Sequence, residues 1–122
     1  MSQQPSPRMR RINEAVKEVL ATRLVDLKDP RLGLVTVTEV RTTPDLANAD
    51  VYYTVLPDDD ESRSATAEGL RSASSLLRRE LGVHLRTRRV PDLHFTHDPV
   101  PAQGRRIETL LRGEQAQEGD AS

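Results

Sequence analysis

Hydrophobic residues recur at three- and four-residue steps between positions 12 and 27, a pattern typical of one face of an amphipathic helix. Ser6 and Pro7 precede this repeat and fit an N-cap followed by proline at the first helical position. The helix should end near Asp29-Pro30, because the residue before a proline disfavours the helical conformation. The pattern therefore predicts an N-terminal helix that is buried along one side.

A second repeat of the same period predicts a helix that begins around Ser62 and runs to Leu81, with Gly82 well placed as the residue that ends it. The apolar side chains of this helix share one arc and its arginines lie opposite: Leu70, Ala73, Leu77 and Leu81 against Arg71, Arg78 and Arg79. Residues 72–75 include three serines, which compete for backbone hydrogen bonds and can bend a helix. We expect a break between two helical halves at that point.

Three shorter segments are typical of strands. Residues 34–42 are rich in β-branched side chains, residues 49–56 alternate between apolar and polar, and residues 93–97 follow a Val-Pro pair. Val40 has the opposite parity to Val37, which indicates a bulge or an edge in the first strand. The first two strands are close in sequence and should form an antiparallel hairpin.

The order helix, strand, strand, helix, strand predicts an α+β fold in which a three-stranded sheet carries its helices on one face. The turn before the first strand contains Asp29, Pro30, Leu32 and Gly33, which we interpret as structural residues. Gly33 can take a positive φ in such a turn. A short final helix is expected at residues 104–112.

The length of 122 residues suits one domain. We expect a flexible N-terminus at residues 1–7, one domain at residues 8–112 and a disordered acidic tail at residues 113–122. No apolar run approaches the roughly 20 residues of a membrane span, and the N-terminus lacks the apolar segment of a secretory signal. The chain has no cysteine, which excludes disulfides and thiolate metal sites. These features predict a cytoplasmic protein without membrane association.

Charge is segregated along the chain, although the formal net charge is only −1. Residues 71–89 carry six arginines against Glu80, a local charge of +5, whereas residues 58–61 carry −4. Guanidinium groups pair bidentately with phosphate oxygens, so the basic stretch suits a nucleic-acid backbone. Alternatively, the arginines form a solvated helix face, and the acidic run forms a solvated loop and helix cap.

The arginines that could contact phosphates form two groups, one at residues 78–89 and one near the N-terminus. A second cluster crowds the start of the first helix, where the helix dipole does not favour cations, and this hints at an external anion. The candidate phosphate-binding residues are Arg78, Arg79, Arg86, Arg88 and Arg89, with Arg8, Arg10 and Arg11 as the second patch.

Candidates for catalysis or metal binding are His84, His94, His97 and Asp98. On a strand, His94 and His97 point to opposite faces and cannot converge. The chain has no HExxH motif, no P-loop and no nucleophile elbow. We therefore expect no enzyme activity, no cofactor and no metal.

The sequence argues against one other class of binding domain and leaves a second class open. An RNA-recognition-motif domain needs aromatic side chains on its sheet, and Tyr52, Tyr53 and Phe95 are too few. A protein-interaction module could use the edge of the strand at residues 34–42 together with the acidic loop at residues 58–61. A steep dependence on salt would distinguish phosphate contacts from an apolar interface.

Three blocks of sequence carry a family resemblance: KDPRLGLVTVTEVRTTPDLANADVYYTV at residues 28–55, Ala-Ser-Ser at residues 73–75 and LRTRRVPDLHF at residues 85–95. With these blocks the chain resembles bacterial ribosome-binding factor A over residues 8–112. The resemblance implies a single type II KH-like domain with a kinked second helix. It also implies an assembly factor that binds free small (30S) ribosomal subunits, assists late maturation of 16S rRNA and supports growth in the cold. Further partners would be ribosomal proteins and a ribosome-assembly GTPase, and the free protein would be a monomer.

Ala73, Ser74 and Ser75 fall at the position of the Ala-x-Gly kink of this family, which replaces the GxxG loop of ordinary KH domains. No two glycines in the chain stand three residues apart, so a GxxG loop is absent. Serine at the glycine position of the kink can still bend a helix, but it lets another backbone come less close.

Overall fold

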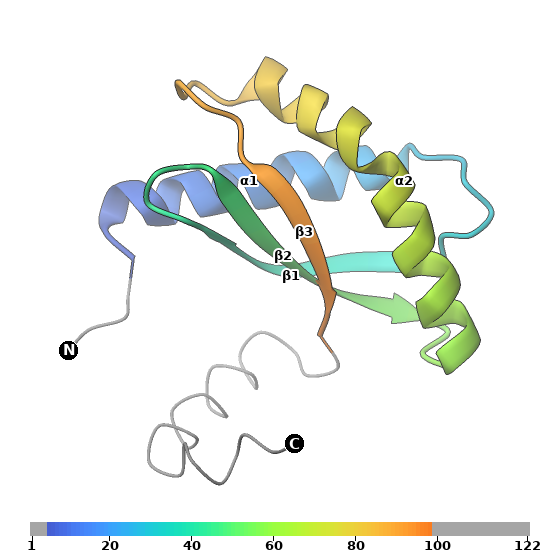
Figure 1. Cartoon of the computed structure of the whole chain (residues 1–122). Coiled ribbons are helices and arrows are strands. Elements are labelled where there is room, and N and C mark those ends of the chain that lie inside the picture. The colour runs from blue at the N-terminus through green and yellow to red at the C-terminus, as the bar shows by residue number, and fades with distance from the viewer. Residues whose placement is uncertain (1–4, 99–122) are drawn as a thin grey trace, which may run out of the picture.

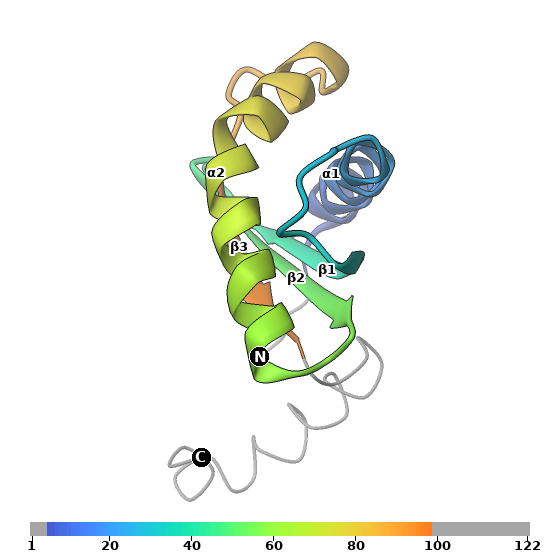
Figure 2. The same ribbon diagram turned by 90° about the vertical axis from the view of Figure 1, so that its right-hand side faces the viewer.

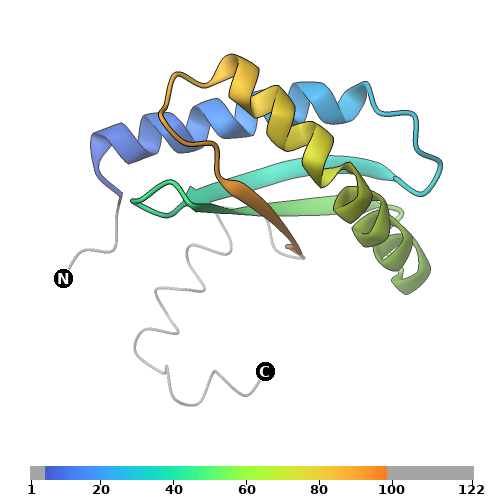
Figure 3. The ribbon, with the colours of Figure 1, turned by 45° about the horizontal axis from the view of Figure 1, so that its top comes forward.

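The computed structural model describes residues 5–98, which form two helices and a three-stranded sheet. In chain order the elements are α1 (Pro7–Val25), β1 (Leu34–Thr42), β2 (Asn48–Leu56), α2 (Asp60–His84) and β3 (Asp92–His97). Both helices lie on one face of the sheet (Figures 1 and 3). The predicted α+β fold, element order and one-sided packing are confirmed. The expected final helix at residues 104–112 and tail at residues 113–122 lie outside the described residues.

The central strand of the sheet is β2. It pairs antiparallel with β1 and parallel with β3, so that α2 forms the crossover between β2 and β3. The register of β1 on β2 shifts between Val37 and Glu39, which leaves Thr38 without a partner residue in β2. This bulge lets both Val37 and Val40 be buried, although their parities differ. The bulge predicted from Val40 is confirmed.

The core lies between the sheet and the two helices. The buried residues of the helices are Met9, Ile12, Val16, Leu20 and Leu24 in α1, and Thr66, Gly69, Leu70, Leu77 and Leu81 in α2. Alternate residues of β2 also lie in the core, namely Ala49, Val51, Tyr53 and Val55, together with Val37, Val40, Leu46 and Leu93. The buried positions of the helices mostly repeat at the three- and four-residue steps that predicted these helices. Within residues 5–98, neither helix has the length and apolar character needed to cross a bilayer.

The start of α1 agrees with the sequence, whereas the predicted end of α2 does not. The hydroxyl of Ser6 caps α1 by accepting a hydrogen bond from the N–H of Met9 at 3.2 Å. The prediction that α2 ends at Gly82 is wrong, because the helix continues to His84 and its cap is Leu85. Gly82 is therefore a helical residue, and the helical hydrogen bonds continue past it.

The second helix is continuous but not straight. Figures 1 and 2 show that its first half, in lime green, and its second half, in gold, point in different directions. The serine-containing segment 72–75 lies near the middle of α2, where serine side chains can compete for backbone hydrogen bonds. The break expected between two helical halves thus takes the form of a bend in one helix.

Gly33 is required by a close approach and not by its φ angle. The expectation of a positive φ is wrong, because among the described residues the one with a positive φ is Leu46, at 61°. A Cβ atom at Gly33 would lie 2.7 Å from the carbonyl oxygen of Leu56 and 2.9 Å from Cγ2 of Val55. The N–H of Gly33 also donates to the hydroxyl of Thr66 in α2 at 3.2 Å. This turn is thereby fixed against both β2 and α2.

Asp29 and Leu32 stabilise the same turn. The carboxylate of Asp29 accepts hydrogen bonds from the Arg31 guanidinium at 2.7 and 3.1 Å and from the Arg31 N–H at 2.9 Å, and these bonds lower the pKa of Asp29. Leu32 packs on α2, where a Cβ atom at Gly69 would lie 2.8 Å from Cδ2 of Leu32. These contacts support the structural interpretation of the turn.

Candidate nucleic-acid interface

The second half of α2 and two loops meet at one end of the molecule (Figures 1 and 3). One loop, residues 43–47, joins β1 to β2, and the other, residues 85–91, joins α2 to β3. An open hollow of about 540 Å³ lies here, and its lining residues are Ala47, Asn48, Arg78, Arg79, Gly82, Arg88, Arg89, Val90 and Asp92. We call this region the arginine end. It brings together four of the five arginines predicted between residues 78 and 89, while Arg86 does not line the hollow.

Two of these arginines hold the loops in place. Arg78 donates from Nη2 to the carbonyl oxygen of Val90 at 2.9 Å, and its Nε lies 3.2 Å from Oδ1 of Asp92. Arg89 donates from Nη1 to the carbonyl oxygen of Asp45 at 3.4 Å. These contacts connect the α2–β3 loop both to α2 and to the β1–β2 loop. We call Arg78 and Arg89 the clasp arginines.

Three other arginines lack such contacts. The side chains of Arg79, Arg86 and Arg88 are exposed and make no hydrogen bond or ion pair within residues 5–98. A guanidinium group has five N–H donors, so each of these side chains keeps its full donor capacity for an external anion. We call Arg79, Arg86 and Arg88 the free arginines.

The second predicted patch consists of Arg8, Arg10 and Arg11. All three are exposed near the start of α1, whose first turn contains no acidic residue, and Arg10 donates to the carbonyl oxygen of Pro5 at 3.3 Å. The start of α1 lies beside the β1–β2 loop in Figures 1 and 3, and the N–H of Thr42 donates to Asn13 Oδ1 at 2.9 Å. The second patch is therefore at the same end of the molecule as the hollow but does not line it.

Nearby acidic groups are engaged in other contacts. Asp45 accepts a hydrogen bond from the Thr43 hydroxyl at 2.7 Å and from the Ala47 N–H at 3.0 Å, and these bonds lower the pKa of Asp45. Oε1 of Glu80 lies 3.4 Å from Nε of Arg23 on α1. Neither carboxylate makes an ion pair with a free arginine.

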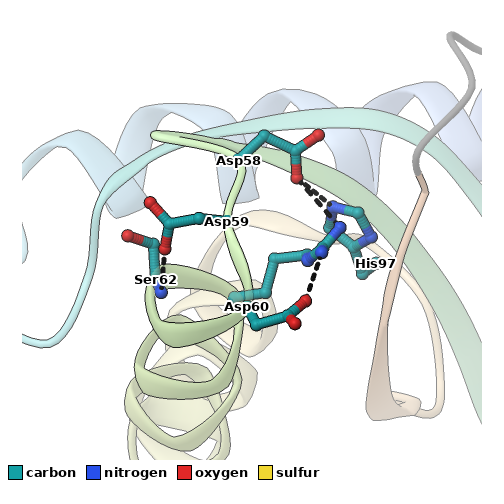
Figure 4. A network of polar contacts seen from close by, with 6 residues as sticks. Asp58, Asp59, Asp60, Ser62 and His97 are labelled. Atoms are coloured by element: carbon teal, nitrogen blue, oxygen red, sulfur yellow. Dashed lines mark hydrogen bonds and ion pairs between the residues drawn. The ribbon is translucent and has the colours of Figure 1, made fainter.

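The acidic run at residues 58–61 lies at the start of α2, and its contacts are internal (Figure 4). Asp59 is the N-cap of α2. Arg63 lies 2.6 Å from Asp60 and 3.2 Å from Asp58, and Nε2 of His97 lies 3.4 Å from Asp58. We call the run, with the neighbouring turn at residues 28–33, the acidic end. The sequence offered a helix cap as one interpretation of this acidic run, and the structure contains that cap at Asp59.

The residues considered for catalysis do not converge. His84 ends α2, His94 is exposed on β3, and His97 is partly buried on the same strand, with its ring centroid 5.8 Å from that of Tyr53. Asp98 is buried just after β3. Within the described part of the chain, no three His, Asp or Glu side chains are grouped so that they could hold a metal ion.

The aromatic side chains do not form a platform for stacking bases. Tyr53 is buried under the helices, and this burial raises the pKa of its hydroxyl. Phe95 packs edge-on against Tyr53, with ring centroids 6.4 Å apart. Among the described aromatic residues, this leaves Tyr52 for the uncovered face of the sheet, which argues against an RNA-recognition-motif mode of binding.

Sequence patterns did not single out Asn48 and Asp92, which line the hollow between the arginines. They are partners in the parallel register of β2 and β3, and only that register brings them together.

In the kink segment, Ala73 and Ser74 are partly buried, whereas Ser75 is exposed.

The chain is similar to known proteins over most of its length. The Ribosome-binding factor A family profile matches residues 8–111. Ribosome-binding factor A of Geobacter sulfurreducens is 42% identical over 113 residues, which are 92% of this chain and 95% of that protein. The crystal structure of ribosome-binding factor A from Thermus thermophilus aligns with a TM-score of 0.64 and 29% identity, over 73% of this chain and 94% of that one. A homology model of the Thermus thermophilus factor, fitted into the cryo-EM map of a 30S complex, aligns with a TM-score of 0.57 and 27% identity, over 76% of this chain and 93% of that one. The expected KH-like fold is confirmed.

Proposed function

Because this chain belongs to the ribosome-binding factor A family, we propose that it binds free small (30S) ribosomal subunits and assists late maturation of 16S rRNA without catalysis. The observation that carries the proposal is the set of three free arginines at one end of a fold that resembles a factor fitted into a 30S complex.

The free arginines are the proposed phosphate contacts. Each guanidinium can donate two parallel hydrogen bonds to a phosphate, and each contact releases counterions from the RNA. The clasp arginines have a different role, because their donors are already used to hold the α2–β3 loop. That loop carries Arg86 and Arg88, so the clasp fixes the positions from which these two residues reach the RNA.

Recognition by this surface depends on RNA shape more than on base sequence. The chain lacks a GxxG loop and an aromatic platform, which are common means of reading single strands. The patch at Arg8, Arg10 and Arg11 adds a second group of phosphate contacts at the same end of the molecule. Two patches on one rigid domain would fix its orientation on a folded RNA.

The remaining expectations depend on the same proposal. A cytoplasmic monomer would bind the subunit, contact ribosomal proteins there and leave with the help of a ribosome-assembly GTPase. Loss of the factor would then impair 16S rRNA processing and growth in the cold.

A protein-interaction module is the second candidate function, and one observation favours it. Within the described residues β1 pairs only with β2, so its outer edge could accept an added strand, except at Thr42, whose N–H already donates to Asn13. The acidic loop supports this candidate less, because Arg63 and the helix cap already engage its carboxylates.

Co-sedimentation with isolated 30S subunits, 50S subunits and 70S ribosomes at several salt concentrations tests the proposal. The wild-type protein should pellet with 30S subunits alone, less so as the salt concentration rises. Arg79→Glu/Arg88→Glu should weaken binding about a hundredfold, since each lost charge-assisted contact is worth about tenfold. The matched control is Lys17→Glu/Lys28→Glu, which changes the charge equally on α1 and on the α1–β1 connection.

The control variant should bind as the wild type does. Equal weakening by both variants would show that overall charge, and not the arginine end, governs binding. If folded wild-type protein pellets with no ribosomal particle at low salt, the proposed function is wrong and the edge of β1 becomes the surface to test.

A further inference from the structure

The hollow at the arginine end presents more than positive charge. Its lining includes Asn48 at the start of β2 and Asp92 at the start of β3, which are register partners in neighbouring parallel strands. Gly82 also lines the hollow, so no side chain extends from α2 into it at that position. Polar groups of both strands and the cations of α2 therefore surround one concave space.

Asn48 and Asp92 each keep an unused polar group. Oδ1 of Asn48 lies 2.8 Å from Nε2 of His94, and because this oxygen can only accept, the His94 N–H is the donor. The amide NH₂ of Asn48 makes no hydrogen bond within residues 5–98. Oδ1 of Asp92 faces Arg78, and in the same part of the chain its other oxygen has no partner. An unused donor on Asn48 and an unused acceptor on Asp92 thus belong to register partners on neighbouring strands, and the edge of a nucleobase offers the matching acceptor and donor.

The dimensions and the cations also suit a nucleotide. A volume of about 540 Å³ lies within the range of small-molecule sites, about 300–1,000 Å³. Two of the free arginines, Arg79 and Arg88, line the hollow. Their planar guanidinium groups can stack on a base or pair with its flanking phosphates, which substitutes for the missing aromatic platform.

We propose that this hollow receives a single unpaired nucleotide of folded RNA, with Asn48 and Asp92 at the base edge and Arg79 and Arg88 on the base face and the phosphates. This inference rests on the proposed function, since it assumes that the arginine end meets RNA. It adds a preference that phosphate contacts alone would not give: an RNA with an extruded base should bind better than a fully paired RNA of equal charge.

Fluorescence anisotropy with two labelled RNA hairpins tests the inference, using the full-length chain at one fixed salt concentration. One hairpin is fully paired and the other contains one bulged nucleotide, in four versions with A, C, G or U. The wild-type protein should bind at least one bulged hairpin about five- to tenfold more tightly than the paired one, the gain from one or two base-edge hydrogen bonds. Asn48→Ala should remove this preference and leave binding of the paired hairpin unchanged.

Two further variants separate base contact from side effects. His94→Ala removes the partner of Asn48 Oδ1 but keeps the amide NH₂, so the preference for the bulge should persist. Asp92→Asn keeps an oxygen for Arg78 and replaces the unused acceptor with a donor, so the preferred bulged base should change. Circular dichroism of each variant checks that it is folded.

Equal binding of paired and bulged hairpins by the wild type would overturn the inference. A bulge preference that survives in folded Asn48→Ala and is unchanged in Asp92→Asn would overturn it too, because the base would then be held elsewhere. Both results leave the proposed function standing as long as the protein still pellets with 30S subunits. Failure to pellet is the separate outcome that rejects the function.

Discussion

Two charged regions lie at opposite ends of α2 and differ in how the chain treats their charges. At the acidic end, Asp59 caps the helix and Arg63 lies close to both Asp58 and Asp60. At the arginine end, three guanidinium groups make no hydrogen bond or ion pair within the described residues. The first region uses its charge to build the fold, whereas the second holds its charge available for a partner.

The two regions also differ in how closely their backbone is packed. The turn of the acidic end is packed so closely against β2 and α2 that Gly33 has no room for a side chain. At the arginine end the backbone surrounds an open hollow, and Gly82 has space around it. The comparison shows that unsatisfied charge together with unfilled space, more than the amount of charge, marks the candidate site.

Substituting the two glycines should produce the largest difference in stability between the ends. Gly33→Ala should lower the free energy of unfolding by about 1–3 kcal/mol, since its Cβ would meet the carbonyl oxygen of Leu56 at 2.7 Å. Gly82→Ala should raise it by about 0.5–1 kcal/mol, because alanine is the better helix former and the nearest atom, of Val90, is 3.4 Å away. Urea denaturation measures both. A destabilised Gly82→Ala variant would contradict the view that the hollow leaves space at this helix.

The neighbouring residues Arg78 and Arg79 allow the sharpest test within the arginine end. Arg79→Ala should reduce 30S affinity about five- to tenfold and reduce the slope of log affinity against log salt by about 0.7–0.9, without changing stability. Arg78→Ala should instead lower the free energy of unfolding by about 0.5–1 kcal/mol, since it loses an exposed ion pair and a hydrogen bond to Val90.

Hydrogen exchange provides the control for this pair. Amides of residues 85–91 should exchange faster in Arg78→Ala and at the wild-type rate in Arg79→Ala. If the two variants gave the same salt slope and the same exchange rates, the distinction between clasp and free arginines would be wrong.

The fold could be predicted from the sequence wherever a local pattern decides the structure. The three- and four-residue steps located both helices, and the parity of Val40 located the bulge. The prediction for Gly33 failed because Leu56, which is distant in sequence, crowds this glycine, and the prediction for Gly82 failed because the helix continues past it to His84. No local pattern reports such contacts.

The candidate site could be predicted only as a group of residues. Sequence alone placed Arg78 and Arg79 on the exposed face of α2, but it could not show that one is held by the α2–β3 loop and the other is not. That difference arises because the loop folds back onto α2. Asn48 and Asp92 escaped notice for a related reason, since they become neighbours only through the pairing of β2 with β3.

The smallest expected effect is a pH dependence that arises at the acidic end. The Ser62 N–H and hydroxyl and the charge of Arg63 lower the pKa of Asp59 below its ordinary value of 3.8. The folded state therefore binds this proton less readily than the unfolded state. The resulting stability is present above the pKa of the unfolded state and is lost as the pH falls through the pKa of the folded state.

Urea denaturation between pH 5 and pH 3 should show this loss of stability in the wild type and a smaller loss in Asp59→Asn. At pH 7 the variant should be nearly as stable as the wild type, because asparagine is also a good N-cap. An undiminished loss in Asp59→Asn would show that other carboxylates cause the acid sensitivity and that the cap does not depend on the charge of Asp59.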